Sequence, residues 1–488
     1  MQITCGEEVG TCTYNCSFHN AGMINSLVSP AQWAQNEFEF AQLGDKRRNQ
    51  RLVKIAQKLA ASPGGTLPQA FADWAELKAA YRFFSGPGAH FDQIISPHLE
   101  RTRASCGQPG EYLIIEDTTV LNYSHHPAAE DLGFVGKGER GLELHSALAV
   151  RVESWTLEQR PEGRLVGLLG QRCSAPRPAP ASETRLESFK RSRKSQRWAE
   201  VFKVAGAAPP GVQWIYVADR ESDFYEPIQI CQQHGNDFII RANHNRRLAD
   251  EPGHLWDALE SAAGLGLSTV ELRARAGEGA RTARVALKAC RVVLDGPWRP
   301  GGWQAPLAEM TVVEVKEVNP PEGIKEPLHW RLLTSLPCQS LVQAQRVVGR
   351  YTARWWIEEY HKALKTGAGV EDSQLKRGDR LESLLAVLAV VAVRLLGAKL
   401  LARSCPESFA ATESFGPDMI QVLEHKFGSP KGGWTNHNLL VAVARVGGFI
   451  GRKSDGMPGW LTIWRGWQRL MWMCQGLEIL NSNKKTCG

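Results

Sequence analysis

The sequence predicts an α/β protein, with a mixed-sheet core that carries an antiparallel β insertion and with a helical domain at each end. Three patterns predict this arrangement. Apolar residues recur at helical spacing over residues 31–105, alternating strand-like runs begin near residue 112, and a long apolar run covers residues 384–401. At about 100–200 residues per domain, a chain of 488 residues holds two to four domains.

The composition is that of an ordinary globular protein. Hydrophobic residues make up 43% and charged residues 22% of the chain, which excludes extensive disorder and fibrous repeats. Lys and Arg exceed Asp and Glu by 58 − 51 = 7, a charge compatible with a polyanionic partner. Basic side chains gather at 44–58 and 189–198, where a nucleic-acid contact and a merely solvated face are both open.

Residues 1–30 are expected to be a disordered or wrongly assigned extension, with the functional start near Met23. The segment lacks the apolar stretch of a signal peptide. Four of its side chains could in principle gather a metal, but their spacing fits no standard zinc pattern: Cys5, Cys12, Cys16 and His19.

Two further features favour a cytoplasmic protein with no membrane partner. Eleven cysteines without a paired CxxC framework suit a reducing compartment. Arg394 and Lys399 interrupt the apolar run over 384–401, and charges there would be costly in a bilayer. The run therefore predicts a buried core helix.

Residues 31–105 are predicted to form a small helical domain. Its second helix begins after Gly44 and Asp45, where the Asp45 side chain can cap free backbone N–H groups. Four basic residues then recur at helical spacing and are expected to form a basic ridge: Arg47, Arg48, Arg51 and Lys54.

Residues 106–375 are predicted to form the core. Two buried runs each end in an acid, YLIIED at Asp117 and VQWIYVAD at Asp219, and strand ends are where α/β sheets expose functional groups. Between them lie the strands LHSALAVRVES and RLVGLLGQR, a Pro-rich loop and a basic helix over roughly residues 186–205. Alternating runs with Gly and Pro turns over 248–328 predict the antiparallel insertion. After the strand WRLLTS, a long helix is expected from Ser340 through Glu358 to Lys365.

Only one of the two neighbouring acids in LIIEDTT can serve a site on one face of the sheet. In a regular strand Ile115 and Asp117 share a face, while Glu116 points to the other. Alternation alone leaves open which of the two faces holds the site.

Four residues of the long helix share one face. Tyr351, Arg354, Glu358 and Lys365 fall within about a 60° arc at 100° per residue, whereas Glu359 is rotated by about 100° and leaves this stripe. An acid between two cations and a phenol suits a phosphodiester site, with Glu358 holding a metal and the cations neutralising the backbone. An amphipathic helix with an internal ion-pair lattice is the alternative.

Three segments in order resemble the signature blocks of the DDE transposases of bacterial insertion sequences, within the RNase H-like superfamily that includes retroviral integrases. They are IEDTT at 115–119, ADRESD at 218–223 and YTARWWIEEYHKALKTGAG at 351–369. The last matches the Tyr-x2-Arg-x3-Glu-x6-Lys signature of the cut-and-paste group in which a β-rich domain interrupts the core. The resemblance runs from LGDKRR near residue 43 to ARVGGF near residue 449.

This resemblance implies an RNase H-like catalytic core and assigns roles residue by residue. Asp117, Asp219 and Glu358 resemble the metal-binding, catalytic triad. Trp330 takes the position at which the group stacks a base flipped from the DNA end, although a core role is the alternative for a Trp before a strand. The remaining DNA contacts that it implies are Tyr351, Arg354, Lys365, Arg48 and Arg51, with Arg241 counted among them.

The chemistry implied by the resemblance uses two Mg²⁺ ions per active site, with Mn²⁺ as a substitute, bridged by Asp117. Water cuts one strand, the freed 3′-OH forms a DNA hairpin, a second water reopens it, and the 3′-OH attacks target DNA. The DNA partners are the terminal inverted repeats and the target, in a cytoplasmic, nucleoid-associated setting. Two rival functions stay open: an RNase H-like endonuclease without strand transfer, and an end-binding regulator that does not cleave.

Residues 376–488 are predicted to form a helical C-terminal domain, which the resemblance makes the contact of a homodimer in the DNA complex. Trp460, Trp464 and Trp467 recur at helical spacing, followed by Trp472. A stripe of this kind packs either against a partner or against its own domain, and own-domain packing is expected for most of these rings.

Overall fold

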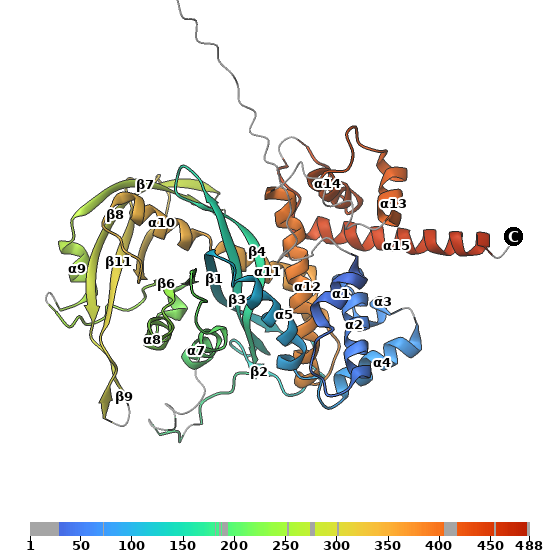
Figure 1. Cartoon of the computed structure of the whole chain (residues 1–488), viewed down its shortest axis with the longest axis horizontal. Helices are drawn as coiled ribbons and strands as arrows, with labels where there is room; N and C mark the ends of the chain where they lie inside the picture. The colour runs from blue at the N-terminus through green and yellow to red at the C-terminus, as the bar shows by residue number, and fades with distance from the viewer. Residues whose placement is uncertain are drawn as a thin grey trace, which may run out of the picture.

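The structure is a computed structural model with a mixed sheet on one side and helices of both chain ends on the other (Figure 1). The residues that it describes are 29–71, 73–180, 182–184, 187, 194–250, 253–273, 279–299, 302–404, 417–452 and 455–485. The extension expected over 1–30 lies outside them except for its last two residues. Of these, Ser29 caps the first helix and Pro30 begins it.

The N-terminal region is helical, as predicted. Asp45 caps the second helix, because its side chain accepts a hydrogen bond from the backbone N–H of Arg47 at 2.7 Å. The helices are α1 (Pro30–Phe38), α2 (Lys46–Ala61), α3 (Leu67–Ala70), α4 (Trp74–Ser85) and α5 (Phe91–Ser105).

Ten strands of the described residues form one mixed sheet, in the order β2-β3-β1-β5-β6-β12-β11-β8-β7, with β4 paired to β3. The pairs β1–β5 and β5–β6 are parallel, and the other pairs between these strands are antiparallel. The strands of the first half are β1 (Gly110–Asn122), β2 (Gly133–Phe134), β3 (Arg140–Trp155), β4 (Pro161–Ser174), β5 (Val212–Ala218) and β6 (Asp237–Arg241).

The predicted antiparallel insertion extends this same sheet. Its edge strand β7 pairs with β8, β8 pairs with β11, and β11 pairs with β12, which pairs with β6 in the core. The elements here are α9 (Leu255–Ser261), β7 (Gly264–Leu272), β8 (Arg281–Leu294), β9 (Trp298–Arg299), β10 (Trp303–Gln304), β11 (Ala308–Glu317) and β12 (His329–Thr334). The fold class predicted from the sequence is thereby confirmed.

Two predictions for the core need correction. β1 does not end at Asp117 but continues to Asn122, because β3 pairs with it along its whole second half. The long helix from Ser340 to Lys365 is broken at Ala353 and Arg354 into α10 (Leu341–Thr352) and α11 (Trp355–Lys362), followed by a π-helical turn, η2 (Ala363–Gly367).

Other helices cover the faces of the sheet. The expected basic helix is α7 (Lys194–Ala205), and the earlier part of its predicted span lies mostly outside the described residues. After Asp219 come a short 3₁₀ turn, η1 (Arg220–Ser222), and α8 (Tyr225–His234), while η3 (Val370–Asp372) follows the π-helical turn.

The long apolar run forms α12 (Gly378–Ser404), which stands between the sheet and the N-terminal helices (Figure 1). By length and composition α12 could cross a membrane, but 83% of its apolar window is buried inside the protein. The prediction of a buried core helix is confirmed. The helices that follow are α13 (Pro417–Phe427), α14 (Asn436–Val446) and α15 (Trp460–Lys485).

A buried carboxylate, Glu37 of α1, joins the N-terminal helices to the sheet. His98 of α5 donates through Nδ1 to Glu37 at 2.8 Å and accepts from the backbone N–H of Leu168 in β4 at 3.1 Å. Arg101 also donates to Glu37, whose side chain is 1% exposed. Burial on its own would raise the pKa of Glu37, but His98 and Arg101, with Arg394 of α12, lower it below its ordinary value.

We expect the substitution Glu37→Ala to destabilise the fold by about 3–5 kcal/mol, because it removes the counter-charge of the buried Arg394 and the hydrogen-bond acceptor of the buried His98. The pKa of Glu37 is lowered in the folded state, so this stabilisation is present at neutral pH and is lost as the pH falls below the ordinary value of 4.5. Urea unfolding at pH 7 and at pH 4 measures both effects. Glu100→Ala, at an exposed position of α5, is the control and should change stability by less than about 0.5 kcal/mol.

Candidate active site

The register of three parallel strands brings two of the predicted acids together. Glu116 of β1 pairs with Ala218 of β5, so the next residues, Asp117 and Asp219, stand at the same level and on the same face of the sheet. Ala218 pairs in turn with Ile240 of β6, which puts Arg241 at that level as well. The sheet therefore presents two carboxylates and a guanidinium side by side.

The third acid comes from α11 and meets the sheet through Arg354. Arg354 Nη1 donates to Asp117 Oδ2 at 3.0 Å, and its Nη2 donates to Glu358 Oε1 at 3.1 Å. The Arg354 side chain is largely buried, and Asp219 also acts on its charge. One guanidinium thus lies among all three predicted acids.

The electrostatics of this cluster centre on Asp117. Burial raises the pKa of Asp117 to about 6; the positive charge of Arg354 opposes the shift, and the nearby negative charge of Asp219 adds to it. Within the described residues, no three His, Cys, Asp or Glu side chains are gathered in a ready metal-binding cluster. In this arrangement Arg354 supplies the positive charge for the acids.

The neighbouring acid Glu116 lies on the opposite face, as strand alternation requires. Its side chain is fully buried, and burial raises its pKa well above the ordinary value. His145 of β3 lies between Glu116 Oε2 at 3.3 Å and Thr118 Oγ1 at 3.0 Å. Glu116 therefore belongs to a polar network behind the sheet, and Asp117 is the acid that faces α11.

The side chain of Glu359, the other competing acid, also points away from the site. It accepts from Lys399 of α12 at 2.7 Å and from Trp460 of α15 at 3.0 Å. Burial by itself would raise the pKa of Glu359, but Lys399 and then Lys362 outweigh it and bring the pKa to about 2. Glu359 is therefore a charged group facing the C-terminal helices.

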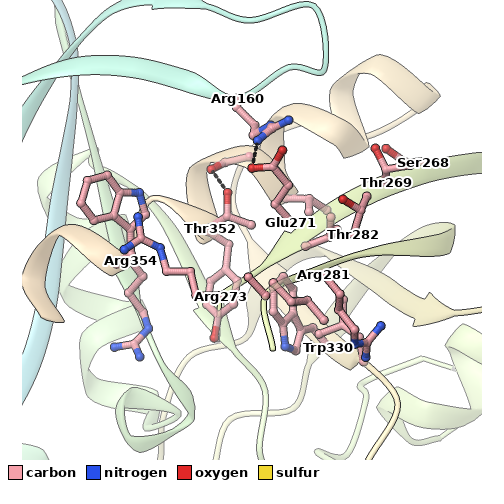
Figure 2. A pocket seen from close by; sticks show the side chains of 18 of the residues that line it. Arg160, Ser268, Thr269, Glu271, Arg273, Arg281, Thr282, Trp330, Thr352 and Arg354 are labelled. Atoms are coloured by element: carbon pink, nitrogen blue, oxygen red, sulfur yellow. Dashed lines mark hydrogen bonds and ion pairs between the residues drawn. The ribbon is translucent and has the colours of Figure 1, made fainter. Parts of the chain in front are cut away.

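A cavity of about 790 Å³ opens beside Glu358, between α10, α11 and the insertion strands (Figure 2). Trp330 and Tyr351 line it and meet edge to face, with ring centroids 5.0 Å apart. Arg241 hydrogen-bonds the Tyr351 phenol, whose pKa burial raises. Five arginines line the cavity: Arg160, Arg241, Arg273, Arg281 and Arg354.

The cavity wall includes residues that carry no signal in the sequence. Arg160, which directly precedes β4, forms an ion pair with Glu271 of β7, drawn as a dashed line in Figure 2. Arg273 follows β7 and places its guanidinium 4.1 Å from the ring centroid of Trp355. These contacts depend on how distant segments meet, which spacing along the chain does not reveal.

Three predicted DNA contacts lie outside the triad cluster. Lys365 lies in the π-helical turn η2, which departs from the regular helix that the stripe assumed, and its Nζ is 3.7 Å from Glu371 Oε1. Arg48 and Arg51 stand on α2 and are half-buried. Arg48 donates to the carbonyl of Leu43 at 3.4 Å, so part of the expected basic ridge supports the domain itself.

Two family models match the chain, one near each end. Residues 30–88 match the family described as "Transposase DNA-binding", and residues 390–487 match "Transposase Tn5 dimerisation domain". A DNA-binding domain and a dimerisation domain on either side of this core define a transposase, a protein that binds DNA and works as a homodimer. The second match is to a domain described for the Tn5 transposase, and at this level the two matches confirm the resemblance to transposases found in the sequence.

The tryptophans of α15 lie in the matched dimerisation domain, and most of them pack within their own chain, as expected. Trp460, Trp464 and Trp467 are buried against their own chain, whereas Trp472 is 63% exposed. Leu461 is 52% exposed and lies 11 residues before Trp472, which is about 20° away on the same helix face. The far half of α15 projects beyond the helices that it packs against (Figure 1).

We expect Trp472→Asp to weaken dimerisation, because exposed aromatic residues on an interface domain often carry about 2 kcal/mol or more of binding. Sedimentation equilibrium with and without DNA measures the dimer constant. Leu307→Asp, an exposed apolar position before β11, is the control. An unchanged dimer constant in Trp472→Asp would place the interface on another surface.

Proposed function

We propose that this transposase binds the terminal inverted repeats of its element, cleaves both strands through a DNA hairpin intermediate and joins the 3′-OH ends to target DNA. Asp117, Asp219 and Glu358 are its catalytic residues. The observation that carries the proposal is the convergence of these acids from two parallel strands and one helix on a single guanidinium, Arg354. The cytoplasm, at the nucleoid, is the location that this activity needs.

The donor set fits a divalent metal. Carboxylate oxygens are the ligands that Mg²⁺ prefers, and the mutual repulsion of Asp117 and Asp219 is relieved by positive charge between them. We propose that Asp117, Asp219 and Glu358 hold two Mg²⁺ ions, or Mn²⁺ as a substitute. When bound, such ions activate water and stabilise charge on the leaving oxygen.

Arg354 has two roles in this proposal. In the free protein it neutralises Asp117 and Glu358. A DNA phosphate is an alternative partner for the same guanidinium, since arginine binds phosphate and carboxylate oxygens with similar geometry. The arrival of the DNA end thereby releases the carboxylates for the metal.

The arginine-rich cavity suits one extruded nucleotide. Trp330 offers a ring on which a base can stack, and Arg241 and Tyr351 stand beside it to bind the phosphate. Unstacking costs a few kcal/mol, and stacking on an aromatic ring returns about 1–3 kcal/mol of it. The successive steps differ only in the nucleophile, so the protein's task is to place water or the 3′-OH in line with the phosphorus atom.

We expect Glu358→Gln to abolish strand cleavage and joining while leaving affinity for end DNA within about threefold. The amide keeps the shape of the side chain but loses the charge that holds a metal. Gel assays with Mg²⁺ measure cleavage, and filter binding measures affinity. Glu322→Gln, at an exposed position after β11, is the control. Cleavage retained by Glu358→Gln would remove this residue from the mechanism.

The same assays separate the rival functions when target DNA is added to the unsubstituted protein. Joined products support the transposase. Cleavage without joining supports an endonuclease that lacks strand transfer, and binding without cleavage supports an end-binding regulator. The three outcomes are mutually exclusive on one gel.

We expect Trp330→Leu to lower the fluorescence of 2-aminopurine placed near the end of the duplex, because the base loses its stacking partner and returns to the helix. Leucine keeps most of the apolar packing around this 8% exposed position. Affinity should fall by about 1–3 kcal/mol. The control is Trp298→Leu, 68% exposed on β9. A signal unchanged from that of the unsubstituted protein would make Trp330 a core residue only.

A further inference from the structure

Glu359 directly follows Glu358 on α11 but faces away from the active site. At 100° per residue the two side chains leave the helix on different sides. The Glu359 side chain is 8% exposed, against 49% for Glu358. A carboxylate in such a place needs partners for its charge.

Hydrogen-bond donors from two other helices and from α11 itself converge on it, and an arginine after β7 lies close by. Oε2 of Glu359 accepts from Lys399 Nζ at 2.7 Å and from Trp460 Nε1 at 3.0 Å. Oε1 accepts from Lys362 Nζ of α11 at 3.1 Å, and Arg273 Nη1 lies 3.9 Å from it. One side chain thus ties α11 to α12, to the first residue of α15 and to the end of β7.

Lys399 and Trp460 both belong to the matched dimerisation domain. Lys399 is 5% exposed, and its Nζ lies 4.0 Å from the ring centroid of Trp460. The Lys399 ammonium, the Trp460 ring and the Glu359 carboxylate are therefore each in contact with the other two. Trp460 stacks on Trp464 at 5.4 Å, and Trp464 lies against Gly367, where a Cβ would come within 2.6 Å of the ring. The helix α15 therefore contacts the catalytic segment at two places, Glu359 and Gly367.

Arg273 links the same carboxylate to the cavity. Its guanidinium lies 4.1 Å from the ring centroid of Trp355, the first residue of α11, and both residues line the cavity beside Glu358. The contacts of Glu359 thus reach from the dimerisation domain to the wall of the proposed nucleotide site.

We propose that Glu359 is a positioning residue, which fixes the rotation of α11 about its axis and so couples the dimerisation domain to the placement of Glu358. The proposal rests on the function proposed above, in which Glu358 is a metal ligand. A small rotation of α11 moves Glu358 relative to Asp117 and Asp219, because those two acids stand on the sheet. A buried ion pair adds little net stability compared with apolar packing, so stability alone does not account for this cluster.

The test measures Mn²⁺ binding to the full-length protein, both alone and on a duplex that carries the terminal repeat. The electron paramagnetic resonance signal of free Mn²⁺ reports how much of the metal is bound. Glu359→Gln keeps the side-chain shape and loses the charge; Trp460→Phe removes one N–H donor and keeps an aromatic ring. On the duplex we expect Glu359→Gln to raise the half-saturating Mn²⁺ concentration by about 10- to 100-fold, the usual effect of losing a group that orients a metal ligand. Trp460→Phe should raise it by about threefold.

Affinity for the duplex without metal should change by less than about twofold in either variant, because neither side chain is placed against DNA. The two variants act on the same contact, from its charged acceptor and from its N–H donor, so the loss of Mn²⁺ affinity in the double variant should be smaller than the sum of the two single losses. A purely structural role would instead give additive effects on the melting temperature, with Mn²⁺ affinity unmoved.

Glu37→Gln is the matched control, since it removes another buried, ion-paired carboxylate far along the chain. It should lower stability and leave Mn²⁺ affinity unchanged; an equal loss of Mn²⁺ affinity there would overturn the proposal. Unchanged Mn²⁺ affinity in Glu359→Gln would also overturn the proposal. If Glu359→Gln does not fold, Trp460→Phe decides, and unchanged Mn²⁺ affinity in that variant would overturn the proposal. Absence of Mn²⁺ binding by the unsubstituted protein would instead overturn the proposed function, and this inference with it.

Discussion

Two like charges stand at the same level of neighbouring parallel strands, and the rest of the core is arranged around their repulsion. The register of β1 and β5 leaves Asp117 and Asp219 no freedom to separate. A fold that holds such a pair requires a compensating positive charge, which Arg354 supplies from the start of α11. The same guanidinium reaches Glu358, so the sheet and the helix are joined by charge as well as by packing.

The break between α10 and α11 makes this arrangement possible. Before the break, Tyr351 is 5% exposed and packs on Trp330; after it, Arg354 contacts both Asp117 of the sheet and Glu358. After the break, the i to i+4 relation of Arg354 and Glu358 survives. The phenol therefore shapes the cavity, and the cation and the acid meet the sheet.

The sequence predicted the elements well because each carries a local pattern. Strand alternation separates Glu116 from Asp117, and helical rotation separates Glu359 from Glu358; the structure confirms both separations. The helix break at Ala353 was missed, because no Pro or Gly marks it. The true end of β1 was also missed, since it depends on pairing with β3. Arg160 and Arg273 could not be predicted for a similar reason. They line the cavity because segments far apart in the sequence meet in the folded chain.

The insertion strands continue the core sheet without interruption, through β12 to β6. Backbone hydrogen bonds therefore connect the cavity wall to the strands that carry the acids, and Arg273 and Arg281, which flank the β7–β8 turn, line the cavity itself. A substitution on the insertion strands would therefore change what the cavity can bind, while the register of β1 and β5 would still hold Asp117 and Asp219 at the same level.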